Sequence, residues 1–293
     1  MSQNGPQLPP NLIFPPGTDL APNGIPWEYT AFGYNPSVPA SIVAAVIFFV
    51  IGLLHAWRTA RFRTLYMVPM TVGCFMETVG YIARIFSRNK PNSIPLYATQ
   101  FGLIVIAPIL FAASIYMVLS RIIQHVSPRH SPVRPGLIAT VFVGFDIVSF
   151  LVQCAGAGVL MGSNDMNIKE IGFKLLIAGL ALQVIFFAGF VVLSFIFERR
   201  ATAAGYNKGG WKKLLYALYF ASICVLIRSV FRVVEFSGGF KSEIAKDEKL
   251  LYTLDFMMMV LAVSIWLVVH PGPALAGPDA DERDGSGAYE MSA

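Results

Sequence analysis

Charged side chains occur inside segments of the chain that are otherwise apolar. Three basic and four acidic residues lie within long hydrophobic stretches of the 293-residue sequence. An unpaired charge near the centre of a membrane helix costs about 2.5–3.5 kcal/mol, so seven would cost on the order of 20 kcal/mol. Because native proteins are stable by only about 5–15 kcal/mol, these side chains must pair with one another or line a wet cavity. They are Glu77, Arg84, Asp146, Arg228, Arg232, Glu235 and Asp255.

The spacing of these residues places them on one face of each predicted helix. Arg228, Arg232 and Glu235 follow an i, i+4, i+7 pattern, which is the repeat of a single helical stripe. We expect the stripes of different helices to converge on a shared polar interior, where a cation, a proton or a lipid headgroup could bind. The candidate substrate-binding residues on these stripes are Glu77, Tyr81, Arg84, Gln100, Asp146, Gln153, Gln183, Arg228, Arg232, Glu235, Tyr252 and Asp255.

Other interpretations of these residues remain open from sequence alone. Glu77 with Arg84, and Arg232 with Glu235, could pair locally and only fix the helix register. His55 and His270 are too far apart in sequence to suggest a zinc site and are expected to cap helices near the interface. The odd number of cysteines, all in apolar segments, predicts no disulfide framework. We therefore expect no metal, no cofactor and no catalytic residue.

Seven long helices must position these side chains. The chain is 55% hydrophobic and 13% charged, against roughly 25% charged residues in soluble proteins. Each apolar segment is about 20 residues or longer, enough to cross a bilayer as a helix. The sequence predicts an all-α, seven-helix membrane domain over residues 37–272, an N-terminal tail over 1–36 and an acidic tail over 273–293. The segments are Val38–Trp57, Leu65–Phe86, Tyr97–Ile122, Leu137–Met161, Ile171–Phe197, Leu214–Phe236 and Leu250–Val269.

The distribution of positive charge predicts the orientation of these helices. The first, third and fifth loops carry eleven Lys and Arg residues against one acid, Glu198, whereas the N-terminal tail has no basic residue. Cytosolic loops are enriched in Lys and Arg, so we expect the N-terminus outside and the C-terminus in the cytosol. The net charge of +5 follows from this topology, and no nucleic-acid-binding motif accompanies it.

Two backbone features are expected to shape the bundle. Pro108 lies midway along the third predicted helix, where it removes a hydrogen bond and predicts a kink. Gly156, Gly158 and Gly162 predict a close-packing face on the fourth helix.

The ordered polar motifs resemble the fungal lipid-translocating exporter (RTA-like) family, named for resistance to aminocholesterol, whose members have seven transmembrane helices. The resemblance extends from about Tyr34 to Pro273. One departure is Ser41, where the family pattern leads us to expect asparagine. The motifs that carry it include Glu77-x-x-Gly80-Tyr81-x-x-Arg84, Tyr97-x-x-Gln100, Asp146-Ile147, Gln153-x-x-Gly156-x-Gly158, Gly179-Leu180-x-x-Gln183, Arg228-x-x-Phe231-Arg232-x-x-Glu235, Glu248-x-x-x-Tyr252-x-x-Asp255 and His270-Pro271-Gly272.

The resemblance implies a multi-pass plasma-membrane protein, not an enzyme, that exports or flops amphiphiles such as sphingoid long-chain bases, or confers drug resistance against sterol-like toxic lipids. Family members linked to porphyrin uptake or to stress-induced membrane remodelling leave the substrate open. The expected partners are membrane lipids, with no nucleic acid, and a homodimer stays open. A cationic amine head would suit Glu77 or Asp255. The sequence has no Gly-x-x-x-x-Gly-Lys-Ser/Thr loop, so transport without ATP hydrolysis is the leading hypothesis.

Two other functions remain as alternatives. A seven-helix lipid sensor or receptor would share the topology, although the third helix ends in Leu119-Ser120-Arg121 rather than Asp-Arg-Tyr. An intramembrane lipid hydrolase would need a metal or an activated nucleophile, and the sequence offers few histidines and no convincing triad.

Overall fold

The described residues form a bundle of seven long helices. The computed structural model describes residues 19–27, 30, 32–91, 93–163, 165–206, 210–238 and 247–275. Seven helices in this part of the chain are long and apolar enough to cross a membrane, and no strand longer than an isolated bridge occurs there. The predicted all-α membrane fold is confirmed. The spans are α1 (Val38–Phe62), α2 (Val68–Asn89), α3 (Ile94–Val126), α4 (Pro135–Gly162), α5 (Met166–Ala203), α6 (Trp211–Ser237) and a seventh, composed of α8 (Glu248–Leu250), η4 (Leu251–Phe256) and α9 (Met257–Val268).

Several helices extend beyond the apolar segments that predicted them. The fifth segment was expected over Ile171–Phe197, but α5 runs over Met166–Ala203. At a rise of 1.5 Å per residue, 38 residues span about 57 Å, which exceeds the roughly 30 Å of a hydrocarbon core. Hydropathy marks only the part of a helix that faces hydrocarbon, so it did not predict the polar ends of α5.

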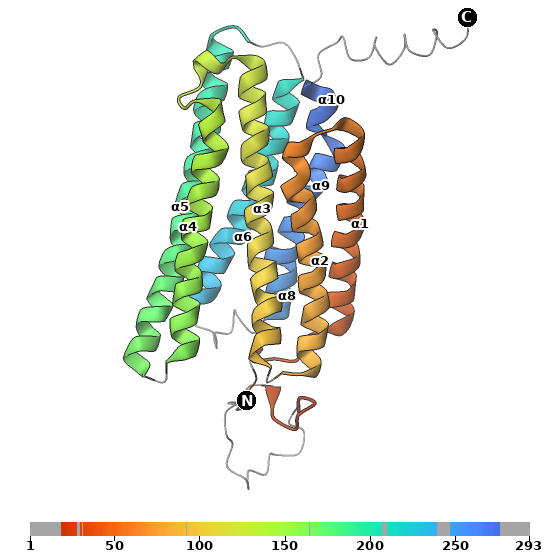
Figure 1. The fold of residues 1–293 in the computed structure, drawn as a ribbon, viewed down its shortest axis with the longest axis vertical. Helices are drawn as coiled ribbons and strands as arrows, with labels where there is room; N and C mark the ends of the chain where they lie inside the picture. The colour runs from red at the N-terminus through yellow and green to blue at the C-terminus, as the bar shows by residue number, and fades with distance from the viewer. Residues whose placement is uncertain are drawn as a thin grey trace, which may run out of the picture.

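The helices form two groups that lie side by side (Figure 1). In the first, α1, α2 and α3 follow one another, with α6 and α9 packed against them. The second consists of the pair α4 and α5, whose lower ends in Figure 1 diverge from α3 and α6. The short elements η2 (Leu65–Met67), η3 (Pro128–His130) and α10 (Pro271–Leu275) lie at the upper end. We call this upper end the arginine-rich end, and the opposite end, where α1 begins, the N-terminal end.

Glycines bring α4 and α5 into close contact. A Cβ added to Gly156 would lie 2.6 Å from the backbone nitrogen of Leu176, and one added to Gly179 would lie 2.7 Å from Cγ of Gln153. Gly158 and Gly162 have open space at the same position. The expected packing face is therefore right for Gly156 and wrong for the other two, because Gly158 lies about 200° around the helix from Gly156.

The part of the N-terminal segment that the structure describes packs against the N-terminal end of the bundle. Trp27 and Phe32 are buried, and the Arg88 guanidinium lies 5.8 Å from the centre of the Trp27 ring. The Phe32 ring meets the Tyr97 ring edge to face at 5.2 Å. Residues 1–18 of the expected tail, and 276–293 of the expected C-terminal tail, lie outside the described residues. The described remainder of the N-terminal tail belongs to the packed structure.

The seventh span contains a π-helical turn. Residues Leu251–Phe256 adopt this wider winding between α8 and α9, a feature that is rare in proteins and frequent at functional sites. Asp255 lies within it and is 1% exposed. The turn thus presents a carboxylate to the interior of the bundle.

Candidate functional site

Arg232 lies at the centre of a buried ion-pair network. Its Nη2 atom is 2.6 Å from Oδ2 of Asp255, and its Nη1 atom is 3.0 Å from Oε2 of Glu235. The Nε atom of Arg228 is 2.7 Å from Oδ1 of Asp255. All four side chains are at most 10% exposed. The predicted Arg232–Glu235 pair is therefore present, and Asp255 balances two arginines that come from one face of α6.

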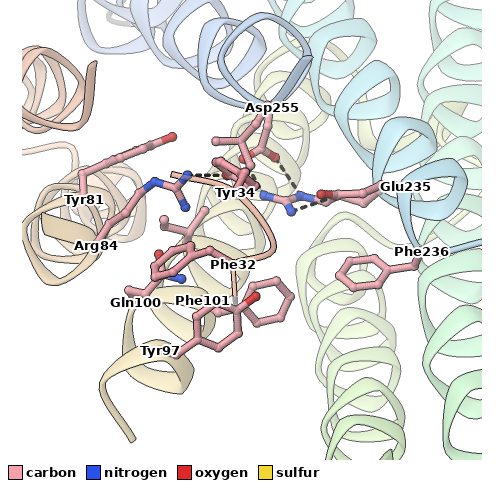
Figure 2. A pocket seen from close by; sticks show the side chains of 13 residues that line it. Phe32, Tyr34, Tyr81, Arg84, Tyr97, Gln100, Phe101, Glu235, Phe236 and Asp255 are labelled. Carbon is pink, nitrogen blue, oxygen red and sulfur yellow. Dashed lines mark hydrogen bonds and ion pairs between the residues drawn. The ribbon is translucent and has the colours of Figure 1, made fainter. Parts of the chain in front are cut away.

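Arg84 joins three separate parts of the chain. Its Nη2 atom donates hydrogen bonds to the Tyr34 hydroxyl at 2.5 Å and to Oε1 of Glu248 at 3.2 Å. Both carboxylate oxygens of Glu248 accept from the backbone nitrogen of Ser37 at 3.0 Å. The suggested local pair of Arg84 with Glu77 is wrong, because the Arg84 side chain instead points toward Tyr34 of the N-terminal segment (Figure 2). It also pairs with Glu248 of α8.

Two members of this network lay outside the predicted set. Glu248 shares the helical stripe of Tyr252 and Asp255, and this stripe was the signal that could have identified it. Tyr34 lies before the first helix in a segment without periodicity, so the sequence offered no comparable signal. Its position depends on the fold of the N-terminal segment over the bundle.

Glu77 is the acid of this region without a salt-bridge partner among the described residues. It is 2% exposed and its Oε2 atom has no hydrogen-bond partner. The charges of Asp255, Arg228 and Arg232 act on it. The network as a whole holds three arginines, which also include Arg84, and four carboxylates, which also include Glu235 and Glu248. With all groups ionised, one negative charge is uncompensated.

A small cavity, which we call the polar chamber, opens beside this network (Figure 2). Its volume is about 60 Å³, roughly twice the share of one water molecule in the liquid. Aromatic rings supply much of its wall, and the buried Oε1 atom of Gln100 has no hydrogen-bond partner. The lining residues are Phe32, Tyr34, Tyr81, Arg84, Tyr97, Gln100, Phe101, Ile104, Arg232, Glu235, Phe236, Leu251 and Asp255.

A second, mainly apolar cavity, which we call the groove, lies between α3, α4, α5 and α6. Its volume is about 230 Å³. Tyr97, Phe101, Arg232 and Phe236 line both the groove and the polar chamber, so the two adjoin. The groove is lined by Tyr97, Ala98, Phe101, Gly102, Val105, Phe150, Gln153, Cys154, Ala157, Gly158, Leu176, Leu180, Gln183, Arg228, Ser229, Arg232 and Phe236.

The predicted amides divide between the two cavities, whereas of the two predicted tyrosines only Tyr81 lines one of them. Gln153 donates from Nε2 to Oε1 of Gln183 at 3.2 Å, across the groove wall between α4 and α5. Tyr81 lines the polar chamber and stacks on Tyr252 with 6.3 Å between ring centres. The Tyr252 hydroxyl lies 3.1 Å from Oγ of Ser41. The unexpected serine at position 41 therefore joins α1 to the seventh span.

Asp146 lies apart from the other candidate residues. The Tyr116 hydroxyl donates to its Oδ2 atom at 2.9 Å, and Asp146 lines neither cavity. Tyr116 packs among Phe142, Phe187 and Phe190. Asp146 shares a helical face with Gln153 but lies seven residues, or about 10 Å, nearer to the start of α4. The shared face placed Asp146 in the predicted set, and its different depth along α4 keeps it out of both cavities.

The two histidines have local partners. His55 is fully buried, and its Nε2 atom lies 3.0 Å from the backbone oxygen of Val263, so it is a core residue and not the interfacial cap that was expected. His270, beyond the seventh span, accepts a hydrogen bond from the Gly272 nitrogen at 3.1 Å. No group of three or more His, Cys, Asp or Glu residues in the described part of the chain is arranged to hold a metal ion.

Comparison with known proteins identifies relatives. Residues 70–277 match the family described as "RTA1 like protein". The chain is 34% identical to Protein RTM1 of Saccharomyces cerevisiae, over 69% of this chain and 66% of that protein. It is 30% identical to Protoporphyrin uptake protein 1 of the same organism, over 80% and 90%, and 23% identical to its Sphingoid long-chain base transporter RSB1, over 84% and 74%. No solved structure matches. With seven membrane-spanning helices and a family match that covers most of its length, the chain is a multi-pass membrane protein of the RTA1-like family.

Proposed function

We propose that this protein translocates single-chain cationic amphiphiles, of which sphingoid long-chain bases are the representative class, without ATP hydrolysis and across the plasma membrane. The observation that carries the proposal is the junction of the polar chamber with the groove at Tyr97, Phe101, Arg232 and Phe236. An amphiphile has one polar end and one apolar end, and this junction offers each end its own environment.

The charge of the network favours a cationic head. Three arginines face four carboxylates, so a bound ammonium group would neutralise the excess negative charge. Glu235 has one arginine partner and lines the polar chamber, whereas Asp255 already balances two arginines. Glu235 is therefore the carboxylate that meets the ammonium group, and the surrounding aromatic rings add cation–π attraction. Glu77 supplies negative charge from behind the chamber wall.

The size of the cavities favours a small head and a single chain. A chamber of about 60 Å³ accommodates an amine with its neighbouring hydroxyl groups and is too small for a macrocycle. The groove of about 230 Å³ is below the roughly 300–1,000 Å³ of a typical ligand pocket, so part of a long chain extends past it into lipid. One relative is named as a sphingoid long-chain base transporter, and a base of that class has the small head and single chain that these volumes favour.

The N-terminal segment lies between the polar chamber and the water at the N-terminal end of the bundle. Phe32 and Tyr34 line the chamber, and the Arg84 guanidinium lies 5.4 Å and 5.8 Å from the centres of their rings. A head that leaves the chamber toward water must displace these two rings. Release therefore depends on breaking the Tyr34–Arg84 hydrogen bond.

Reconstitution into nucleotide-free liposomes tests the proposal. The protein is expected to move a tail-labelled long-chain base between leaflets, and to move its N-acetylated analogue, which has no positive charge, at least tenfold more slowly. Glu235→Gln is expected to slow transport of the base about tenfold or more. Glu170→Gln is the matched control, because Glu170 is an exposed carboxylate paired with Lys174.

The same assay separates the alternatives. A lipid sensor would bind the base without moving it in liposomes that contain no other protein. Wild-type rates in Glu235→Gln would refute the role of this carboxylate. Chemical conversion of the lipid during the assay would favour the hydrolase.

A further inference from the structure

A hollow at the arginine-rich end of the bundle is separate from both the polar chamber and the groove. It forms where α1 ends, η2 begins and α3 ends, with α10 beside them (Figure 1). Its volume is about 430 Å³, and it shares no residue with the two cavities described above. The polar residues of its wall are Arg63, Thr64, Arg121, Gln124 and His125.

The charge of this hollow is positive. Arg63 and Arg121 both line it, and no Asp or Glu is among its lining residues. Neither arginine forms a salt bridge within the described part of the chain. The Arg121 guanidinium lies 5.6 Å from the centre of the Tyr66 ring. Arg63 ends α1 in the left-handed conformation, with φ of 50°. Two arginines, both exposed, thus line one hollow without an internal counter-ion.

A buried hydroxyl group in the same wall has no partner. Thr64 is 3% exposed and its Oγ1 atom makes no hydrogen bond within the described residues. A buried polar group without a partner costs about 1–3 kcal/mol, and because Oγ1 itself is covered, a phosphate oxygen pairs with it only if the wall shifts when the ligand binds. His270 lies next to this wall through its contact with Gly272. Burial lowers the pKa of His270 to about 4, so His270 adds no positive charge here near neutral pH.

We propose that this hollow binds the phosphate group of an anionic phospholipid headgroup. Guanidinium groups bind phosphate oxygens in a bidentate manner, and basic pockets at the ends of membrane helices bind such headgroups. The neighbouring apolar side chains support a lipid over a soluble phosphate. Leu65 is 77% exposed and Phe62 is 42% exposed, which marks this level as the boundary between acyl chains and headgroups.

The matched control for this site is a pair of arginines at the same end of the bundle. Arg129 and Arg134 are exposed and do not line the hollow. The full chain in neutral detergent is titrated with fluorescent phosphatidic acid. Arg63→Asn with Arg121→Gln is expected to weaken binding at least tenfold, and asparagine tolerates the left-handed backbone at position 63. Arg129→Gln with Arg134→Gln is expected to change binding less than twofold. Equal losses in the two double variants would overturn the proposal.

Two further measurements complete the test. Inorganic phosphate is expected to displace the lipid only at concentrations at least a hundredfold higher, and equal potency would refute a lipid ligand. If the Arg63 and Arg121 double variant does not fold, Arg121→Lys takes its place, because it keeps the charge and removes the planar fork. A several-fold loss of affinity supports the site, and unchanged affinity overturns it.

Discussion

Arg228 binds the backbone oxygen that Pro108 leaves free. In an α-helix the nitrogen of residue 108 would donate to the oxygen of Ile104, but proline has no N–H group. The Nη2 atom of Arg228 donates to this oxygen at 3.0 Å, while its Nε atom contacts Asp255. A proline on α3 thus fixes the position of an arginine on α6, and α3 continues as a helix through it.

Replacement of Pro108 by alanine separates stability from function. Alanine restores the helical hydrogen bond, which is worth about 1 kcal/mol, so the melting temperature is expected to stay the same or rise. The restored donor competes with Arg228 for the Ile104 oxygen, and we expect the affinity for a long-chain base to fall three- to tenfold. Pro95→Ala is the control, because Pro95 lies in the first turn of α3. A wild-type affinity in Pro108→Ala would contradict this coupling.

Asp255 and Glu77 are expected to respond differently to neutralisation. Asp255→Asn leaves two buried arginines with insufficient negative charge, and breaking such a buried network costs about 3–5 kcal/mol. The expected fall in melting temperature in detergent is about 10 °C or more. Glu77→Gln removes no salt bridge and is expected to change the melting temperature by less than about 3 °C.

A double variant checks whether the stability lost in Asp255→Asn comes from its unpaired arginines. Arg228→Gln combined with Asp255→Asn restores the balance of charge and is expected to recover part of the lost stability. Equal destabilisation by Glu77→Gln and Asp255→Asn would contradict the assigned pairing.

The sequence predicted the spans and the polar faces but not the partners across helices. Arg228, Arg232 and Glu235 lie on one buried stripe, as the i, i+4, i+7 spacing required. Local spacing suggested that Arg84 pairs with Glu77, yet Arg84 pairs with Glu248. Pairing between helices depends on depth and on which helices are neighbours, and single-helix periodicity contains neither.

The packing of the N-terminal segment against the bundle could not be predicted from the sequence, for a different reason. Its prolines and weak hydropathy are typical of a tail, and its packing depends on aromatic contacts with Arg84 and Arg88. Arg84 was among the predicted site residues, but nothing in the sequence linked it to aromatic residues of the N-terminal segment. The site is complete only when the segment and the bundle are considered together.

Asp146 is expected to matter for stability and not for substrate binding. Tyr116→Phe removes the hydrogen-bond donor of this buried carboxylate, at a cost of about 1–3 kcal/mol. Replacing both residues, by Tyr116→Phe with Asp146→Leu, is expected to recover much of that loss, because no polar group is then left buried. Affinity for a long-chain base should change less than twofold in both variants. A tenfold loss of affinity in Tyr116→Phe would place Asp146 in the binding site after all.

Cysteine labelling tests the orientation that the charge bias predicts. The native cysteines Cys74, Cys154 and Cys224 are first replaced by alanine. A cysteine at the exposed Asn23 position is then expected to react with a membrane-impermeant maleimide in intact cells. A cysteine at the exposed Arg129 position should react only after permeabilisation. The reverse pattern would show that the N-terminus is in the cytosol.

Filling the groove is expected to block long substrates selectively. Gly158 lines the groove and has open space where a Cβ would lie, so Gly158→Leu projects a side chain into the proposed path of the acyl tail. Gly144 lies on the same helix with the same open space and does not line the groove, which makes Gly144→Leu the matched control for volume and helix propensity. Transport of an eighteen-carbon base should fall at least fivefold in Gly158→Leu, and transport of an eight-carbon base should fall less, because its tail ends nearer the chamber. Equal effects of the two glycine variants, or equal effects on both chain lengths, would mean that the tail follows another path.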